Sequence, residues 1–150
     1  MLRFNPASGA VVANSRFAVA VHTAATLAYR QARGAGYVSS EQLAASVRTN
    51  PVVIRRIIRA LARAGVVATK EGKGGGARLA RSPRRIALLD IYRAVEEDGR
   101  VLAYNPIPPN RSCPVSCGIK GALAPVFGAV EGAVTHTLGK ATLEDVLDRI

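Results

Sequence analysis

Apolar residues in the first third of the chain recur at helical spacing. The first run consists of Phe17, Val21, Ala24, Ala25, Ala28 and Tyr29. Intervals of three and four residues are typical of one face of an α-helix, and Asn14 and Ser15 both suit its N-cap. The pattern therefore predicts a helix that ends near Arg33, before Gly34, with His22 as a core or interface residue.

The next two runs predict a helix-turn-helix. Ser39 and Gln42 have the spacing of a capping box for a helix over residues 40–47. Asn50 and Pro51 then suit the N-cap and the first position of another helix. The residues expected to face inward on this recognition helix are Val53, Ile54, Ile57, Ile58 and Leu61. Two short helices joined by a tight turn form this motif.

Beyond Gly65, which would end the recognition helix, the pattern changes to short strands. Residues 66–70 and 77–80 have strand character, and residues 71–76 between them form a glycine-rich turn. A hairpin in this place predicts the wing of a winged helix. Its glycines let the backbone turn sharply and approach a phosphate closely.

Helical spacing returns in the second half. A helix starting at Ser82-Pro83 would contain Ile86, Leu88, Leu89, Ile91, Tyr92 and Val95. A later, longer helix carries a stripe of Leu123, Val126, Phe127, Val130, Val134 and Leu138. This apolar side needs another surface to cover it. Thr142 and Asp145 would cap a terminal helix that bears Leu143, Val146, Leu147 and Ile150.

These elements predict a mainly α fold with a small β-hairpin, in which a winged helix-turn-helix precedes a long C-terminal helix. The expected organisation is a flexible tail over 1–13, the winged helix-turn-helix domain over 14–95, a linker loop over 96–111, and the long helix and the C-terminal helix over 112–150. No uninterrupted run of about 18 apolar residues occurs, so we expect no membrane span and a cytoplasmic protein.

The positive charge of the chain is confined to one segment. The net charge is +11, and residues 48–85 alone contribute +10, whereas residues 86–150 carry −2. Such a distribution indicates a polyanion-binding face. A coding bias towards arginine is the alternative, but it would not spare the C-terminal half.

Three segments supply candidate DNA contacts. They are Ser39, Ser40 and Gln42 at the start of the first short helix, Thr49, Asn50, Val52, Arg55, Arg56 and Arg59 at the start of the recognition helix and along it, and Lys70, Lys73, Gly74, Gly75 and Arg78 on the wing. Arginine pairs bidentately with guanine, so one of the three arginines could read a base. The alternatives are phosphate contacts alone for the arginines, a hairpin with solvated charges for the wing, and a purely capping role for the first group.

Enzymatic chemistry has no support in the sequence. No serine–histidine–aspartate arrangement and no HExxH motif occur, and the glycine run over 72–76 lacks the GK[ST] ending of a phosphate-binding loop. Cys113 and Cys117 are the only cysteines, and His22 and His136 are the only histidines.

Five strings resemble the Rrf2 family of bacterial winged-helix regulators, which includes iron–sulfur, nitric-oxide and cysteine-metabolism repressors. They are SRFAVAVHTAATLAY, VSSEQLA, IRRIIRALARAGVV, GKGGGARLAR and IALLDIYRAVE. The most specific piece is the triple glycine followed by a basic residue, leucine and alanine. Beyond residue 95 the resemblance depends on CPVSCGI, the amphipathic helix and TLEDVL. It implies a homodimer whose long helices cross and whose recognition helices enter successive major grooves.

The resemblance also implies a place for a cofactor. Cluster-bearing relatives bind iron–sulfur through three cysteines in this region, whereas this chain has only Cys113 and Cys117, so we expect no cofactor. If both lie on a helix, their sulfurs share one face, and oxidation would strain the turn. The pair could act as a thiol redox sensor, or the two residues could simply pack near the dimer helix.

The sequence thus predicts a dimeric, sequence-specific transcriptional repressor that binds double-stranded DNA and responds to thiol oxidation or to a small effector. A non-specific nucleoid or RNA-binding module could use the same basic face. A third alternative is that the C-terminal half binds a small molecule or partner protein, with the winged helix as a scaffold.

Overall fold

The computed structural model describes residues 15–96 and 99–150. Along the chain the elements are α1 (Ser15–Gln31), α2 (Ser40–Val47), α3 (Pro51–Arg63), β1 (Val67–Lys70), β2 (Gly76–Leu79), the 3-10 turn η1 (Pro83–Arg85), α4 (Leu88–Val95), α5 (Pro114–Lys140) and α6 (Leu143–Leu147). The fold is mainly helical with one antiparallel hairpin, as predicted. The tail expected over 1–13 and the cap residue Asn14 lie outside the described residues.

The starts of α2 and α3 are fixed by the caps that the sequence predicts. Ser39 Oγ accepts a hydrogen bond from the N–H of Gln42 at 3.2 Å, and Gln42 Oε1 accepts one from the N–H of Ser39 at 3.1 Å. Asn50 Oδ1 accepts from the N–H of Val52 at 2.8 Å. Because each bond joins neighbours in the chain, local sequence alone decides where both helices begin. Between them, Arg48 takes the left-handed conformation, with φ 60° and ψ 51°.

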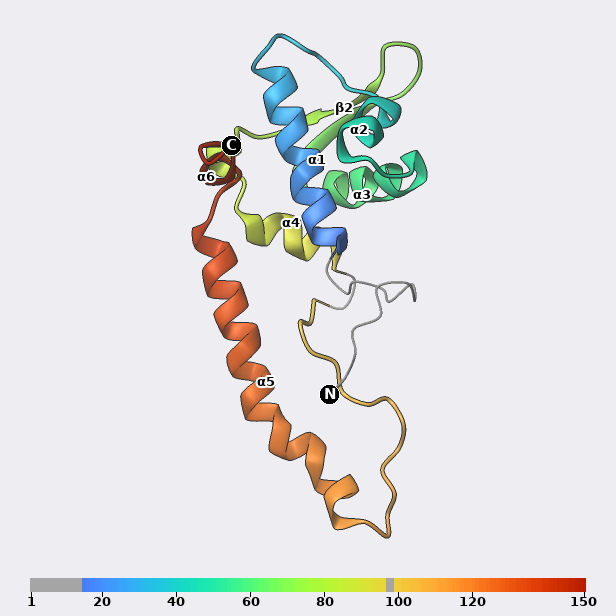
Figure 1. Cartoon of the computed structure of the whole chain (residues 1–150), viewed down its shortest axis with the longest axis vertical. Coiled ribbons are helices and arrows are strands. Elements are labelled where there is room, and N and C mark those ends of the chain that lie inside the picture. The colour runs from blue at the N-terminus through green and yellow to red at the C-terminus, as the bar shows by residue number, and fades with distance from the viewer. Residues whose placement is uncertain (1–14, 97–98) are drawn as a thin grey trace.

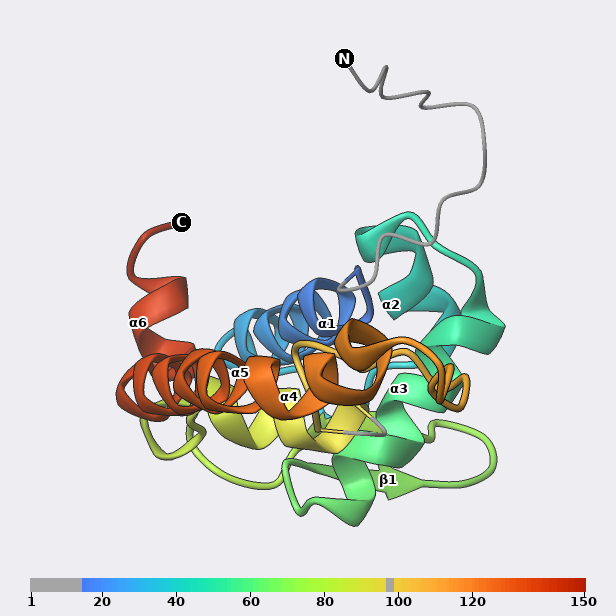
Figure 2. The ribbon, with the colours of Figure 1, turned by 90° about the horizontal axis from the view of Figure 1, so that it is seen from below.

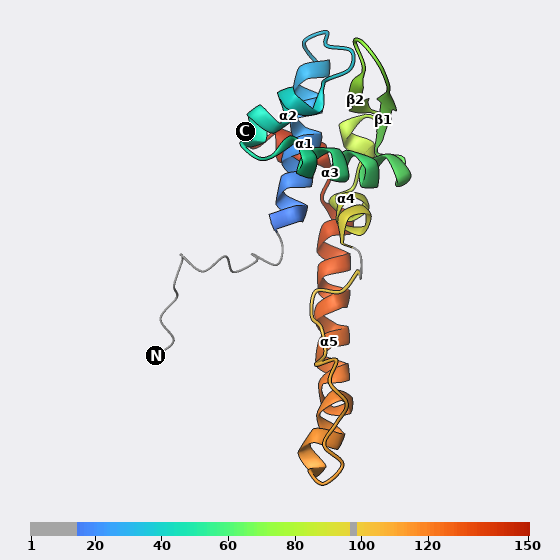
Figure 3. The ribbon, with the colours of Figure 1, turned by 90° about the vertical axis from the view of Figure 1, so that its right-hand side faces the viewer.

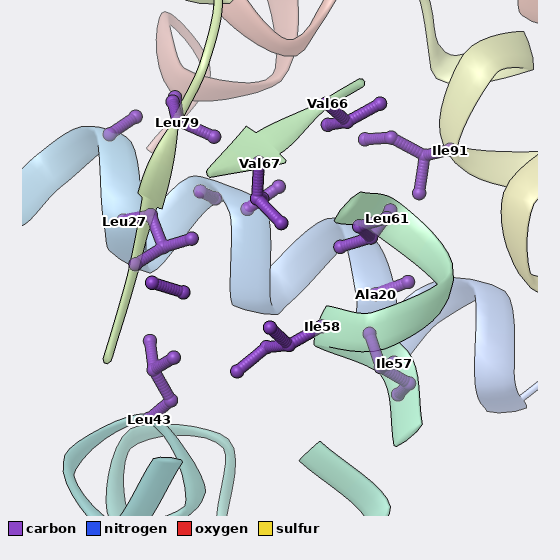
Figure 4. Packing of buried hydrophobic residues seen from close by; sticks show 14 of the residues in the cluster. Ala20, Leu27, Leu43, Ile57, Ile58, Leu61, Val66, Val67, Leu79 and Ile91 are labelled. Carbon is purple, nitrogen blue, oxygen red and sulfur yellow. The ribbon is translucent and has the colours of Figure 1, made fainter. Parts of the chain in front are cut away.

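One hydrophobic core joins the winged domain to the end of the chain (Figure 4). Its fully buried side chains include Leu27, Leu43, Ile54, Leu61, Val66, Ile91 and Leu143. They come from α1, α2, α3, the start of the hairpin, α4 and α6. The C-terminal helix is therefore part of the core that positions the DNA-binding elements.

Three residues predicted to face inward do not. Tyr29 is 53% exposed and lies under the Arg33 guanidinium, which is 3.5 Å from its ring centroid. His22 is also exposed within the single chain, so it is not a core residue, and its predicted interface role stays a prediction. Both residues lie on the side of α1 opposite the buried Ala20. Tyr29 follows Ala20 by nine residues and His22 follows it by two, and these intervals turn an α-helix by about 180° and 200°. Val53 is 39% exposed, since α3 packs through a narrower strip that begins at Ile54.

The helix predicted to start at Ser82-Pro83 is wrong in extent. Ile86 and Ala87 are extended, and the C-terminal segment pairs with them. The Leu143 N–H donates to the Ile86 carbonyl at 2.9 Å, and the Leu88 N–H donates to the Ala141 carbonyl at 2.8 Å. This long-range pairing takes the backbone groups that a continuous helix would need, so only η1 and α4 are helical.

The helix α5 is 27 residues long, about 40 Å at 1.5 Å per residue. It starts far from the winged domain and runs back to it (Figures 1 and 3). Seen from below, it lies across α4 (Figure 2). No described residue of α5 is buried within the chain, and Val126 of the predicted stripe is 56% exposed. Ile150, expected on the terminal apolar face, is 92% exposed.

By length and composition, α5 is also the one described helix that could cross a membrane. Its small and apolar residues give α5 a high mean hydropathy, although they do not form an uninterrupted run of about 18 apolar residues. The expectation of no membrane span stays a prediction. What the structure shows directly is a long helix whose apolar surface its own chain leaves uncovered.

Candidate nucleic-acid interface

The wing and the start of α2 are joined at the backbone. Val38 and Ala77 form an isolated antiparallel bridge, in which each N–H donates to the other's carbonyl at 2.9 Å. The approach depends on Gly76, whose φ is 141° and whose added Cβ would lie 2.2 Å from the Val38 oxygen. Wing and α2 therefore hold a fixed mutual position.

Tyr37 lies beside two cations of the wing. Its ring centroid is 5.9 Å from Lys70 Nζ and 5.7 Å from the Arg78 guanidinium carbon. Both distances allow a cation–π attraction. The two strands carry these side chains on the same side of the hairpin, because Arg78 pairs with Ala68, two residues before Lys70. Tyr37 was not among the predicted contacts, although an aromatic residue directly before a strand bridge could have indicated it.

On the recognition helix α3, Arg55 faces α2. Its Nη1 lies 3.6 Å from Glu41 Oε1, and the two side chains are 50% and 68% exposed. An ion pair this exposed contributes about 0–1 kcal/mol, so a base or phosphate can displace Glu41. Arg55, Tyr37 and the wing cations thus border one surface that starts at α2 and continues onto both neighbouring elements.

The remaining arginines of α3 border a different hollow, of about 390 Å³. Arg56, Arg59 and Arg63 line it together with Arg16 of α1 and Val95 of α4. Arg16 Nη1 donates to the Val95 carbonyl at 3.2 Å, which ties α1 to the end of α4. The structure therefore divides the predicted arginines between two sides of α3. Arg16 and Arg63 line this hollow but were not among the predicted contacts.

The glycines of the wing are required by the conformation of its backbone. Gly72 and Gly74 have φ of 82° and 74°. A Cβ on Gly75 would lie 2.2 Å from the Lys70 carbonyl oxygen, and the Gly75 N–H donates to the Gly72 carbonyl at 3.0 Å. The turn therefore requires glycine for its own geometry, and it presents the exposed Lys73.

The predicted contacts from the helix starts are partly used within the chain. The Ser39 and Gln42 side chains each accept a hydrogen bond from the other residue's backbone N–H, and the Asn50 side chain caps α3. Val52 is 48% exposed. Of these four residues, Val52 is the one whose side chain is fully available for a base contact.

Part of the basic segment has a structural role. Arg81 donates to the Gly65 and Arg85 carbonyls, each at 3.2 Å, and its Nη1 lies 3.3 Å from Asp90 Oδ2. This arginine links the end of α3 to η1 and α4, so it does not belong to the basic surface.

Cys113 and Cys117 lie at the start of α5, but only Cys117 is inside the helix. Cys113 is the N-cap, with φ −115° and ψ 111°, and its Sγ accepts from the Ser116 N–H at 3.5 Å. The Cys117 thiol donates to the Asn110 carbonyl at 3.5 Å. The assumption that both sulfurs share a helical face is therefore wrong, because capping requires extended backbone at Cys113.

Two shifted pKa values lie outside the basic surface. Burial raises the pKa of the Tyr92 phenol, and the nearby Glu131 and Glu96 carboxylates add to this. Hydrogen bonds from the Thr142 backbone and hydroxyl lower the pKa of Asp145. Asp145 Oδ2 accepts from the Thr142 N–H at 2.7 Å, which confirms the cap predicted for α6.

The donor set does not fit an iron–sulfur cluster. Cluster ligation generally takes four protein ligands, and no group of three or more histidine, cysteine or acidic residues suited to a metal ion occurs within 15–96 and 99–150. Cys113 and Cys117 are free thiols already bonded to neighbouring backbone.

Comparison with known proteins agrees with this geometry. The Rrf2 family, described as iron-dependent transcriptional regulators, matches residues 13–149. A candidate HTH-type transcriptional regulator of Bacillus subtilis, YwnA, is 37% identical over 137 residues, which cover 91% of this chain and 98% of that protein.

Solved structures show the same fold. A candidate DNA-binding protein is 36% identical with a TM-score of 0.67, covering 88% of this chain and 98% of its own. CymR, the global cysteine regulator of B. subtilis, is 20% identical with a TM-score of 0.62 and is similar over 100% of this chain and 99% of its own. The family and these relatives are regulators and not enzymes. The chain belongs to the Rrf2 family of winged-helix, DNA-binding transcriptional regulators.

Proposed function

We propose that this regulator binds a two-fold symmetric operator as a homodimer in the cytoplasm and represses transcription there. The observation that carries the proposal is the surface on which Arg55 of α3 and the wing cations Lys70 and Arg78 flank α2 (the basic surface). Arg55 meets α2 through Glu41, and α2 meets the wing through Val38 and Ala77. A winged helix of this form would place α3 in a major groove and the wing on the adjacent backbone.

The exposed side of α5 supports dimerisation. Its residues Val115, Ile119, Ala122, Val126, Ala129 and Ala133 follow one another at intervals of four and three. All six are exposed within the single chain. Such spacing forms the seam of a coiled coil. We therefore propose these six residues (the seam) as the dimer interface, in place of the stripe predicted from the sequence.

One residue of the original stripe packs within the chain, and two others border an apolar hollow. Phe127 stacks on Tyr104, with ring centroids 4.8 Å apart. Val134 and Leu138 line a hollow of about 370 Å³ whose other walls include Phe17 and Tyr92. Leu123 and Val130 are half-buried and border the proposed seam.

The sizes of the seam residues favour antiparallel pairing. If Val126 meets the same residue of a second copy, Ile119 falls opposite Ala133 and Val115 falls opposite Thr137. Large side chains then meet smaller ones on either side of the central Val126 pair, which is how helices interdigitate closely. The second copy's large residues would also reach the apolar hollow beside Tyr92.

Cross-linking tests this arrangement. In a Cys113→Ser/Cys117→Ser background, Val126→Cys should form a disulfide-linked dimer on mild oxidation, because the residue lies on the two-fold axis. Gly128→Cys, on another face of α5, should stay monomeric on a non-reducing gel. Equal cross-linking of both variants, or of neither, would contradict the seam.

Operator binding is tested by fluorescence anisotropy. A duplex selected from a randomised DNA library is compared with a shuffled duplex of the same composition over a range of salt. Specific sites gain typically about 10³-fold or more over non-specific DNA. A preference of this size supports the proposal, and addition of protein should then suppress run-off transcription. Equal affinity for both duplexes would favour the non-specific nucleic-acid module.

We also propose that the protein acts without a resident cluster and that Cys113 and Cys117 respond to oxidation as a pair. Both thiols bond to one short segment, through the Ser116 N–H and the Asn110 carbonyl. A disulfide between them would replace both bonds and release the anchor of the preceding loop.

A further inference from the structure

The segment between α4 and α5 is unusual for its length. From Glu96 to Cys113 the described residues contain no helix or strand. Structureless connections longer than about 12–15 residues are uncommon in compact domains, and they are often binding loops. This segment runs along the lower part of α5, away from α2, α3 and the wing (Figures 1 and 3).

Both ends of the segment are anchored to α5. Near its start, Glu131 Oε1 accepts hydrogen bonds from the N–H groups of Val101 and Leu102. Near its end, the Asn110 N–H donates to Ser116 Oγ at 2.9 Å. The two anchors therefore fix the path of the chain between them, although few of its backbone groups form hydrogen bonds with one another.

A hollow of about 640 Å³ lies between the anchors. Its walls include Arg100, Tyr104, Ile107 and Lys120, and three prolines complete them. The volume is in the range of small-molecule sites. Because proline fixes φ, Pro106, Pro108 and Pro109 make this wall stiffer than an ordinary loop. Asn105 Oδ1 accepts from the Ile107 N–H at 3.0 Å, which fixes the turn further.

The hollow combines positive charge with apolar surface. Arg100 and Lys120 both line it, and none of its lining residues is acidic. The cations stand out because the C-terminal half of the chain is net negative. Tyr104 is held in place by stacking on Phe127, and Lys120 Nζ lies 5.5 Å from its ring centroid.

We infer that this hollow binds a small organic anion with an aromatic or apolar body. The carboxylate or phosphate group would pair with Arg100 and Lys120, and the body would lie against Tyr104 and the prolines. The hollow is distinct from the proposed dimer seam, since Lys120 lies about 100° around α5 from Ile119. It is also remote from α3, so duplex DNA on the basic surface does not compete for it.

The site would regulate DNA binding through the connection itself. The segment links α4, which packs on α1 and α3, to α5. A ligand that binds both Arg100 and Lys120 would fix the path of the connecting segment between the winged domain and α5. This regulatory part rests on the proposed function, whereas binding of the anion does not.

Three probes with the same ring test the site by calorimetry and amide NMR: phenylacetate, benzyl alcohol and benzylamine. Phenylacetate should bind at least about tenfold more tightly than the alcohol, and the amine should not bind. Arg100→Ala and Lys120→Ala should each weaken phenylacetate binding about tenfold, as expected for a charged hydrogen bond. Lys140→Ala, a matched cation at the other end of α5, should have no effect.

Equal binding of all three probes, or insensitivity to both variants, would overturn the anion site. Operator affinity is then measured with and without saturating phenylacetate. A change of threefold or more that Lys120→Ala removes supports regulation, and an unchanged operator affinity overturns that part. If the protein showed no operator preference at all, the proposed function would be wrong. The calorimetry would still show whether the hollow binds the anion.

Discussion

The backbone of Val38 exchanges two hydrogen bonds of 2.9 Å with that of Ala77, so the start of α2 and the base of the wing form one unit. In a winged helix these two elements contact DNA on either side of the recognition helix. Their relative position therefore sets how well the basic surface matches a duplex. Gly76 makes this contact feasible, because any side chain there would collide with the Val38 carbonyl.

Gly76→Ala should lower the free energy of unfolding by at least about 2 kcal/mol, since it adds a clash to a strained φ. Operator affinity should fall with it, even under conditions where the variant is folded. Gly36→Ala is the control, because this glycine has open space around it. Chemical denaturation and anisotropy measure both effects. A Gly76→Ala variant as stable as Gly36→Ala would contradict the close approach.

Replacing both Arg55 and Arg56 by Ala should abolish operator preference and leave residual non-specific binding. Each bidentate arginine–guanine pair contributes about 1–3 kcal/mol of discrimination. Lys73→Ala, in the turn of the wing, should instead weaken operator and shuffled DNA equally and reduce the salt dependence by about one phosphate contact. Unchanged discrimination in the double variant would exclude base reading by these arginines.

Tyr37→Ala should weaken DNA binding about three- to tenfold, because Lys70 and Arg78 lose the ring that orients them. Tyr37→Phe keeps the ring and should bind as the unmodified protein does. Thermal unfolding separates this effect from loss of the hairpin. If the phenylalanine variant binds as weakly as the alanine variant, the ring does not position the cations.

Diamide should lower operator affinity of the unmodified protein and leave Cys117→Ser unaffected. The two thiols give up two electrons and two protons, diamide becomes the hydrazine, and the new disulfide removes the bond from Cys117 to the Asn110 carbonyl. Dithiothreitol should restore binding. Mass spectrometry checks that the disulfide lies within one chain. An equal loss in Cys117→Ser would show that oxidation acts elsewhere.

Local patterns were enough to predict the DNA-binding elements. Ser39 with Gln42, and Asn50 with Pro51, cap helices through neighbours in the chain, so the sequence contains all the information. The change to strand character beyond Gly65 and the glycine-rich turn predicted the wing, and the family resemblance agreed with the order of elements. Both predictions are confirmed by the fold.

Long-range contacts set the limits of prediction. Ile86 is extended because Leu143 pairs with it from the end of the chain, and no local pattern indicates that. Phe127 turns towards Tyr104, so the stripe on α5 is divided between surfaces that periodicity cannot separate. Likewise, the cation partners of Tyr37 come from strands more than thirty residues later.

The central claim is that a two-fold dimer reads a specific sequence with α3. Selection of bound duplexes from a fully randomised DNA library tests it most directly. The account predicts one enriched motif, an inverted repeat whose half-sites are about 10 base pairs apart or a multiple of that spacing. The Arg55→Ala/Arg56→Ala variant should enrich no motif. A library that stays unenriched with the unmodified protein, despite salt-dependent binding, would contradict the claim.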